Sequence, residues 1–301
     1  MQLGMVGLGR MGANMAERLR RVGHDCVGFD PVPAAREAAA ARGLRVAGSL
    51  AALVEAMAPP RAAWLMVPAG EAVDGVLDGL LPLLAPGDVV IDGGNSHYRD
   101  SLRRAARVAG AGIGWLDVGT SGGVHGLAEG YCLTIGGDAG TAARLEPVFQ
   151  ALAPAAGRGW GRVGPAGAGH YAKMVHNGIE YGLMQAYAEG LALLHRRDDL
   201  APDPAKTARI WCDGSVIRSW LLELCADALE QDPALSGVAP YVADSGEGRW
   251  TVAEALELDV PAPVITQAMI ARLRSRDAEG FGDRVVAALR DAFGGHGVRP
   301  G

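Results

Sequence analysis

The chain has 301 residues, of which 49% are hydrophobic and 21% charged, which is enough to build a large buried core and favours two domains. The formal net charge of −6 argues against broad binding to nucleic acid or anionic membranes, and no apolar run reaches the ~18 residues of a membrane-spanning helix. The four cysteines form no CxxC pair, and the first expected strand begins almost at Met1, which leaves no room for a signal peptide. We therefore expect a soluble, cytoplasmic protein with free thiols.

Strand-like and helical patterns alternate through the first half of the chain. A helical pattern over 12–22 follows the first of the expected strands, which cover 2–6, 26–29, 64–67, 89–91, 114–118 and 132–135. Strands that alternate with helices indicate an α/β fold in which a mostly parallel sheet is covered on both faces. We predict a Rossmann-type parallel-sheet domain over residues 1–163.

Beyond Pro165 the sequence shows no convincing strand pattern. A long helix is expected over 166–196, followed by shorter helices at 204–213, 217–231, 261–276 and 280–293 and by an irregular tail. We therefore predict an all-α C-terminal domain over residues 164–301, which carries the substrate-binding and dimerisation surfaces.

A G-x-G-x-x-G motif, GLGRMG, lies between the first expected strand and its helix. In this context Gly7 permits a tight turn, Gly9 lets the backbone approach a pyrophosphate, and Gly12 allows the helix to pack closely on the strand. The helix N-terminus then offers unpaired N–H groups to the phosphates. We predict a dinucleotide site whose loop residues are Gly7, Leu8, Gly9, Arg10, Met11 and Gly12.

Asp30 ends the second expected strand, where a carboxylate accepts hydrogen bonds from the adenosine ribose and repels a 2′-phosphate. The cofactor is therefore expected to be NAD, with NADP less favoured. Two alternatives stay open. Asp30 can instead shape the turn before Pro31, and Arg10 and Arg36 can neutralise a phosphate.

Five polar side chains recur at helical spacing within the long expected helix. They are Lys173, His176, Asn177, Glu180 and Tyr181, and the other faces of this helix are mainly apolar. The pattern predicts that the polar face borders an internal cavity. Lys173 and Glu180 stand about 10 Å apart along the axis, so a base and an acid can act on one small ligand, and burial lowers the proton affinity of a lysine. A structural lysine–glutamate pair is the alternative.

Five motifs together resemble the β-hydroxyacid dehydrogenase superfamily and, more closely, its 6-phosphogluconate dehydrogenase family. They are GLGRMGANM (7–15), MVPAG (66–70), IDGGNS (91–96), GTSGG (119–123) and KMVHNGIEYG (173–182). The last is the most specific, because the His-Asn pair, the Glu and the Tyr all follow the Lys at the family's spacing. Residues 246–272 resemble the family's stretch that ends in a phosphate-binding arginine.

The resemblance implies oxidative decarboxylation of 6-phospho-D-gluconate to D-ribulose 5-phosphate, in pentose phosphate or gluconate metabolism. Lys173 takes the proton of the 3-hydroxyl as the hydride leaves for nicotinamide, and Glu180 protonates C1 of the product, with no metal required. The substrate-binding residues that it implies are Asn95, Ser121, Gly122, Gly123, His176, Asn177, Tyr181, Arg272, Arg290 and His296. The further cofactor contacts that it implies are Val67, Pro68, Ala69 and Asn95. For the loop at 121–123 taken alone, a plain turn stays open.

The C-terminal segment LRDAFGGHG (289–297) also resembles the family's tail. In the family an arginine and a histidine of that tail, here Arg290 and His296, reach the active site of a neighbouring subunit. The resemblance therefore implies a homodimer or homotetramer.

Several features depart from the long form of the family. The chain is much shorter and resembles a short form with one helical unit. Ser245 stands where the long form has a phosphate-binding lysine, and Val124 and His125 replace an acidic pair. Two other functions remain open: an NAD-linked dehydrogenase or reductase of a small β-hydroxyacid, such as 3-hydroxyisobutyrate or tartronate semialdehyde, and a non-catalytic dinucleotide-binding sensor.

Overall fold

The computed structural model describes residues 1–295 and 297–299. The chain divides into two compact units, Met1–His176 and Asn177–Gly301, and the division falls within one long helix, α9 (Ala168–His195). An α/β unit followed by a helical unit confirms the predicted fold class. Among the described helices, none has both the length and the apolar character needed to cross a membrane.

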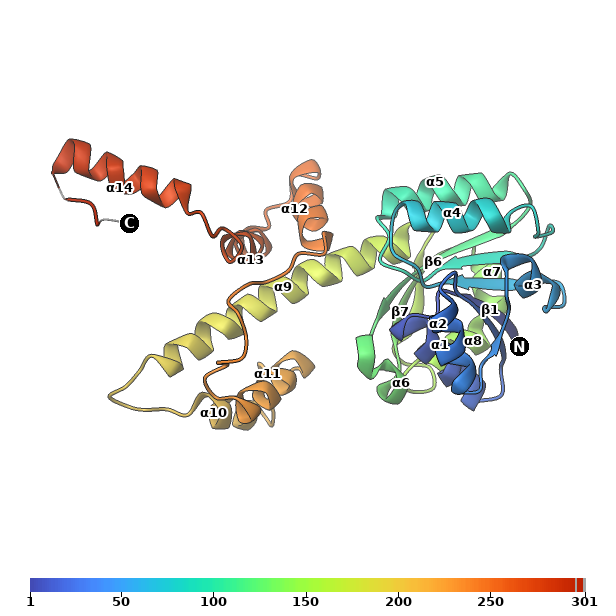
Figure 1. Ribbon diagram of the computed structural model, residues 1–301, viewed down its shortest axis with the longest axis horizontal. Helices are drawn as coiled ribbons and strands as arrows, with labels where there is room; N and C mark the ends of the chain where they lie inside the picture. The colour runs from blue at the N-terminus through green and yellow to red at the C-terminus, as the bar shows by residue number, and fades with distance from the viewer. Residues whose placement is uncertain (296, 300–301) are drawn as a thin grey trace. The chain divides into compact units, whose positions relative to one another are not determined.

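The first unit is built around an eight-stranded sheet (Figure 1). Its strands are β1 (Gln2–Val6), β2 (Asp25–Phe29), β3 (Arg45–Val46), β4 (Ala62–Leu65), β5 (Val89–Asp92), β6 (Gly114–Ser121), β7 (Cys132–Gly137) and β8 (Trp160–Gly164). They lie in the order β3-β2-β1-β4-β5-β6-β7-β8, and all neighbours are parallel except β6 and β7. Because β1 lies between β2 and β4, the strand order reverses there, and such a point opens a crevice at the carboxyl ends of the strands.

Helices cover both faces of this sheet. They are α1 (Arg10–Arg21), α2 (Pro33–Ala41), α3 (Leu50–Glu55), α4 (Glu71–Leu80), α5 (Tyr98–Ala109), α6 (Gly126–Glu129), α7 (Ala139–Arg144) and α8 (Glu146–Leu152), with a 3-10 turn, η1 (Gly123–His125). Successive residues of β1 enter different core clusters: Met5 joins Met15 of α1, whereas Val6 joins Leu77 of α4. Strands buried on both faces are apolar almost throughout, which explains their short continuous apolar runs.

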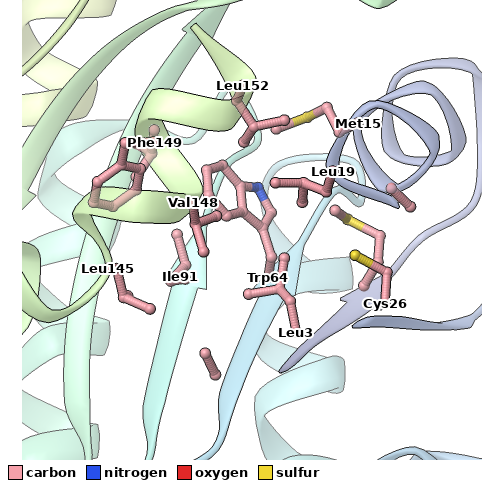
Figure 2. Close-up of a cluster of buried hydrophobic side chains, with 14 of the residues drawn as sticks. Leu3, Met15, Leu19, Cys26, Trp64, Ile91, Leu145, Val148, Phe149 and Leu152 are labelled. Carbon is pink, nitrogen blue, oxygen red and sulfur yellow. The ribbon is translucent and has the colours of Figure 1, made fainter. Parts of the chain in front are cut away.

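Trp64 of β4 lies at the centre of the first cluster (Figure 2). Its ring meets that of Phe149 edge-on, with the ring centroids 6.0 Å apart, and both side chains are fully buried. The indole Nε1 donates to Sδ of Met66 at 3.3 Å. This cluster therefore anchors the end of β4 and the start of the loop that follows it.

The described part of the second unit contains helices and no strand. After α9 come α10 (Pro204–Trp211), α11 (Trp220–Gln231), α12 (Glu247–Glu257), α13 (Pro263–Arg274) and α14 (Phe281–Gly294). Helices α10 and α11 pack with Leu191 of α9 through Ala208, Leu222 and Ala226. Every side chain of α14 that the structure describes is exposed.

Strands β3 and β8 and helix α12 are among the elements not expected from the sequence. Strand β3 has only two residues, and β8 (WGRVG) is an edge strand with glycines and no buried alternation. The buried side of α12 consists of Glu247, Gly248 and Thr251, so no apolar stripe reveals this helix. Strand β4 begins at Ala62, earlier than expected, and leaves Met66 in the loop after it.

Candidate active site

The glycine loop lies between β1 and α1, as its motif predicts. Gly7 has φ of +95°, and a Cβ there would lie 2.4 Å from the carbonyl oxygen of Met66, while a Cβ at Gly12 would lie 2.0 Å from that of Gly7. At Gly9 a Cβ would meet nothing within 4 Å. Two glycines are therefore required by packing, whereas Gly9 borders open space at the N-terminus of α1, where backbone N–H groups can hold a phosphate.

Asp30 lies directly after β2 and is buried. Its two carboxylate oxygens accept hydrogen bonds from the backbone amides of Leu8 and Val32, each at 2.8 Å. Arg36 donates to the carbonyl oxygens of Asp30 and Pro31, at 2.6 and 3.2 Å. Asp30 therefore shapes the turn and also joins it to the glycine loop, and its oxygens keep lone pairs for further donors.

A pocket of about 410 Å³ opens beside the glycine loop. Its lining residues are Gly9, Arg10, Met11, Gly12, Met66, Val67, Pro68, Ala69, Gly93, Gly94, Asn95 and Thr120. The glycine loop therefore shares one pocket with the MVPAG and IDGGNS segments. Met66, Gly93, Gly94 and Thr120 lie within the quoted motifs but were not among the predicted contact residues, although the paired glycines were a signal: a Cβ at Gly93 would lie 2.1 Å from Trp64 Nε1.

The first turns of α9 pack directly on β6. Asp117 of β6 is fully buried and accepts hydrogen bonds from the amides of Gly167 and His170, at 2.6 and 2.9 Å, so it places a carboxylate at the helix N-terminus. A Cβ at Gly119 would lie 2.4 Å from Cβ of Lys173. Strand β6 thus fixes the position of Lys173, and the neighbour of Gly119 in that strand, Thr120, lines the cofactor pocket.

Lys173 is 8% exposed, and its Nζ lies 3.4 Å from Nδ1 of His176, one turn further along α9. An imidazole nitrogen without a proton accepts a hydrogen bond from an ammonium group. The structure therefore brings together the first two members of the predicted polar stripe, with the lysine buried and the histidine exposed.

The GTSGG segment makes a sharp turn after β6. Ser121 ends the strand, and Gly122 and Gly123 have φ of +131° and +50°, which only glycine adopts readily. A Cβ at Gly122 would lie 3.2 Å from the ring of Tyr131. Burial raises the pKa of Tyr131 to about 12, so this ring supports the turn as a neutral phenol.

The rest of the polar stripe lies in the second unit. Asn177 and Tyr181 are buried, and Glu180 is half-buried. Arg272 of α13 lies over the ring of Tyr181, with Cζ 3.5 Å from the ring centroid, and it donates to the carbonyl oxygen of Ala243 at 2.8 Å. The structure thus brings together Tyr181 and Arg272, two of the residues implied for phosphate binding.

Ser245 lies beside this pair and contributes a hydroxyl without charge. Its Oγ lies 3.3 Å from the hydroxyl of Tyr181 and donates to the carboxylate of Glu247. Arg249, close by in sequence, forms an ion pair with Asp244. Burial works against ionisation of Asp244, but the hydrogen bond from Arg249 and further contacts outweigh it and lower its pKa.

The other predicted residues lie elsewhere in the chain. Asn95 is exposed and lines the cofactor pocket. Val124 and His125, which stand in place of the family's acidic pair, belong to η1. Arg290 is exposed on α14. His296 lies outside the described residues.

Two domain families match this sequence. Residues 2–161 match the NAD binding domain of 6-phosphogluconate dehydrogenase, and residues 169–284 match the 6-phosphogluconate dehydrogenase C-terminal domain. The chain belongs to the 6-phosphogluconate dehydrogenase family. This membership confirms the resemblance drawn from the motifs, and the first match confirms that the glycine-loop unit is an NAD-binding domain.

Relatives within the family differ in length. The chain is 48% identical over 300 residues to "6-phosphogluconate dehydrogenase, NAD(+)-dependent, decarboxylating" of Haloferax volcanii, with 99% of this chain and 98% of that protein covered. It is 40% identical to the decarboxylating 6-phosphogluconate dehydrogenase of Treponema pallidum, over 90% of this chain but only 58% of that protein. The family therefore includes relatives of this chain's length and much longer ones.

Solved structures also resemble this chain. The Plasmodium falciparum 6-phosphogluconate dehydrogenase, studied with NADP+ and with 6-phosphogluconate, has a TM-score of 0.86 at 26% identity, covering 98% of this chain and 65% of that one. The Mycobacterium tuberculosis 3-hydroxyisobutyrate dehydrogenase has a TM-score of 0.73 at 27% identity, covering 92% of this chain and 94% of that one. The fold is therefore shared with enzymes acting on two kinds of hydroxyacid.

Proposed function

We propose that this protein oxidises and decarboxylates 6-phospho-D-gluconate to D-ribulose 5-phosphate and CO2, with NAD as the preferred hydride acceptor. The observation that carries the proposal is the 48% identity, over nearly the whole of both chains, with a relative named as NAD(+)-dependent and decarboxylating. The site supports it chemically, because a buried lysine on α9 packs against the strand that also lines the cofactor pocket.

In this reaction Lys173 acts first as a base. It accepts the proton of the substrate's 3-hydroxyl while the hydrogen on C3 leaves as hydride. NAD, when bound, supplies the hydride acceptor. The contact between Nζ and Nδ1 of His176 gives the lysine a polar partner, which accepts a hydrogen bond from the protonated amine when Nδ1 carries no proton.

The 3-keto acid that results can lose CO2, because its carboxylate is β to the ketone. The protonated Lys173 polarises the ketone oxygen as the C1–C2 bond breaks, so that the electron pair moves into an enediol. Glu180, two turns further along the same face of α9, then protonates the carbon that becomes C1 of ribulose 5-phosphate.

The remaining roles follow the chemistry of the substrate. Ser121 and the amides of Gly122 and Gly123 bind its carboxylate, and Asn95, His176 and Asn177 hold the reacting hydroxyls. Tyr181 and Arg272 bind the phosphate, for which an arginine offers bidentate geometry. Ser245 adds a neutral donor at that end, where the long form has a lysine.

The preference for NAD rests on Asp30. Both hydrogen bonds described above for its carboxylate come from neutral backbone amides, not from a cation. The negative charge of Asp30 therefore remains to repel a 2′-phosphate on the ribose. Arg36, which could neutralise a 2′-phosphate, donates to main-chain carbonyl oxygens of the same turn. NADP is therefore the weaker alternative.

We also propose a homodimer or homotetramer in which Arg290 and His296 serve a neighbouring subunit, and a domain boundary near residue 163. The exposed apolar side chains of α14, Phe281, Val286 and Leu289, support an association between copies. A helix of this length is only marginally stable in water when nothing packs against it.

A second candidate is an NAD-linked dehydrogenase of a small β-hydroxyacid. The nearly full-length similarity to a 3-hydroxyisobutyrate dehydrogenase favours it. Both candidates use the same fold and cofactor, so only the substrate decides between them.

The deciding experiment follows NADH and CO2 together. Purified protein with NAD is given 6-phosphogluconate, gluconate or 3-hydroxyisobutyrate, with the Lys173→Met variant as control. We expect equal amounts of NADH and CO2 from 6-phosphogluconate alone and none from the variant. NADH without CO2 from 3-hydroxyisobutyrate would establish the second candidate, and NADH binding without turnover of any acid would indicate a sensor.

A further inference from the structure

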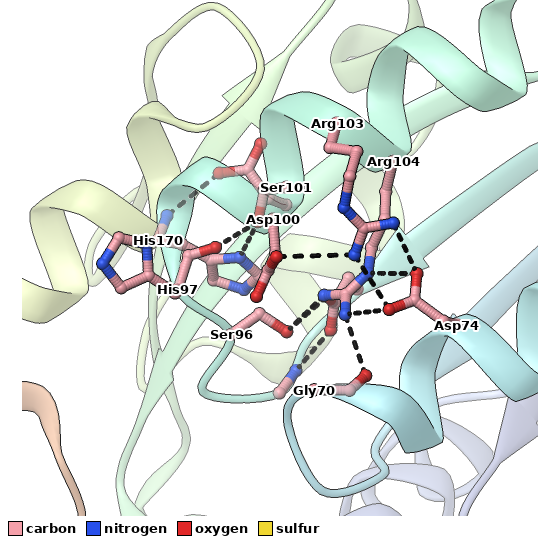
Figure 3. Close-up of polar contacts among 12 residues, drawn as sticks. Gly70, Asp74, Ser96, His97, Asp100, Ser101, Arg103, Arg104 and His170 are labelled. Carbon is pink, nitrogen blue, oxygen red and sulfur yellow. Dashed lines mark hydrogen bonds and ion pairs between the residues drawn. The ribbon is translucent and has the colours of Figure 1, made fainter.

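A buried arginine joins two loops of the cofactor pocket (Figure 3). Arg104 lies on α5 and is fully buried. Its Nη2 donates to the carbonyl oxygen of Gly70 at 2.8 Å, and its Nη1 donates to Oγ of Ser96 at 3.2 Å. Gly70 directly follows Ala69, and Ser96 directly follows Asn95, and both preceding residues line the pocket. One guanidinium thus holds the ends of both pocket loops.

The other donors of this guanidinium are also engaged. Its Nε and Nη2 form a bidentate pair with Asp74 of α4, at 3.1 and 3.0 Å. Its Nη1 lies 3.6 Å from Asp92, which ends β5 and accepts a 2.7 Å hydrogen bond from Ser96 Oγ. Hydrogen bonds from Arg104 and Arg103 lower the pKa of Asp74, so this carboxylate stays ionised and holds the guanidinium in place.

The two loops lie on one side of the glycine loop. Asp30, proposed to bind the adenosine ribose, follows β2, whereas the two loops follow β4 and β5. In the sheet, β1 lies between β2 on one side and β4 and β5 on the other. A dinucleotide whose pyrophosphate rests at the N-terminus of α1 therefore extends its nicotinamide half over the loops that Arg104 joins. Its adenosine half extends the other way.

We propose that Arg104 is a positioning residue, which fixes the MVPAG and IDGGNS loops relative to each other and so shapes the nicotinamide half of the cofactor pocket. It is not one of the residues that line the pocket, and it acts through Gly70 and Ser96. An arginine suits this role because its rigid fork serves both loops at once, which a lysine cannot do. The inference concerns the cofactor pocket and holds whichever acid is the substrate.

The test compares a whole dinucleotide with its adenosine half. Dissociation constants of NADH and of ADP are measured by titration calorimetry for the wild type, Arg104→Met and Arg103→Met. Arg103 is the matched control, because it pairs with the same Asp74 but is half exposed, and among the described residues its hydrogen bonds go to Asp74 and Asp100 rather than to a pocket loop. We expect Arg104→Met to raise the dissociation constant of NADH about tenfold, the usual effect of losing a charged hydrogen bond. The dissociation constant of ADP should stay unchanged.

Unchanged NADH affinity in a folded Arg104→Met protein would overturn the proposal. So would an equal loss for NADH and ADP, because a merely structural role lowers both. Should Arg104→Met not fold, Ser96→Ala decides by the same comparison, since it removes one loop contact and keeps the pair with Asp74. We expect Ser96→Ala to raise the dissociation constant of NADH about threefold without changing that of ADP.

Discussion

The carboxylate of Asp30 takes part in the fold and, in the role proposed above, also faces the ribose of the cofactor. It accepts two backbone amides and stands where the ribose of the cofactor is expected. Replacement by asparagine keeps the size of the side chain and one of the two hydrogen bonds to backbone amides, and it removes the charge that repels a 2′-phosphate. A ratio of the activities with the two cofactors isolates specificity at this position, because a loss of stability lowers both activities alike.

For the Asp30→Asn variant we expect the ratio of kcat/KM for NAD to that for NADP to fall about tenfold, equivalent to about 1.4 kcal/mol. The measurement is steady-state kinetics with each cofactor at saturating substrate. Asp25→Asn is the control, because Asp25 lies exposed at the opposite end of β2. An unchanged ratio in Asp30→Asn would contradict the role given to this carboxylate.

At the scale of elements, the close packing of α9 against β6 depends on Gly119. The Gly119→Ala variant forces a Cβ to within 2.4 Å of Lys173 Cβ and 2.5 Å of Thr134 Oγ1. We expect the free energy of unfolding to fall by about 1–3 kcal/mol, as overpacking usually costs, and turnover to fall because Lys173 shifts. Urea unfolding and steady-state kinetics measure the two effects.

Gly161→Ala is the matched control, because a Cβ at this strand position in β8 would meet nothing within 4 Å. We expect its unfolding free energy to change by less than about 0.5 kcal/mol, as at an unconstrained surface site. Equal losses in the two variants would mean that helix and strand do not pack through Gly119 as described.

The elements that the sequence predicts are those whose signal is local. The glycine loop and the stripe on α9 could be read because their residues are neighbours along one turn or one helix face. Helix α12 could not, because Glu247 and Thr251 occupy its buried side. The partners of Asp117 and Arg104 were hidden for another reason: they lie 50 and 34 positions away in sequence at Gly167 and Gly70.

At the scale of the whole molecule, a buried thiol links stability to pH. Burial, aided by the charge of Asp25, raises the pKa of Cys26 from 9.0 to about 12. Between these values the unfolded chain has lost the proton that the folded chain keeps, so the free energy of unfolding falls as pH rises above 9. Below pH 9 both states hold the proton, and the contribution is fully present.

We therefore expect Cys26 to account for about 1 kcal/mol of the stability lost between pH 8 and pH 10. Urea unfolding with reductant present measures this loss in the wild type and in Cys26→Ala. The free energy of unfolding of Cys26→Ala should fall by about 1 kcal/mol less than that of the wild type. Cys132→Ala, at an exposed thiol, serves as the control and should follow the wild type. A pH dependence that is the same in all three proteins would contradict the assignment.

The proposed association between subunits makes a prediction about mixed oligomers. Lys173→Met lacks the base, and Arg290→Ala lacks the tail arginine, so each protein alone should be nearly inactive. In a mixed dimer, the site that keeps Lys173 receives the tail of the Lys173→Met subunit, whose Arg290 is intact. Random pairing then restores about a quarter of wild-type activity, because half of the dimers each contain one complete site.

The mixture is made by coexpressing the two variants, and its activity is measured per subunit together with its mass by light scattering. In the control, the double variant Lys173→Met/Arg290→Ala replaces Lys173→Met. Its tail has no arginine for the neighbouring site, so this mixture should show no restored activity. Activity equal to the average of the two parent proteins would show that Arg290 serves its own subunit or none. The mass measured by light scattering tests the association itself, and a monomeric mass would mean that no second copy covers the exposed apolar side of α14.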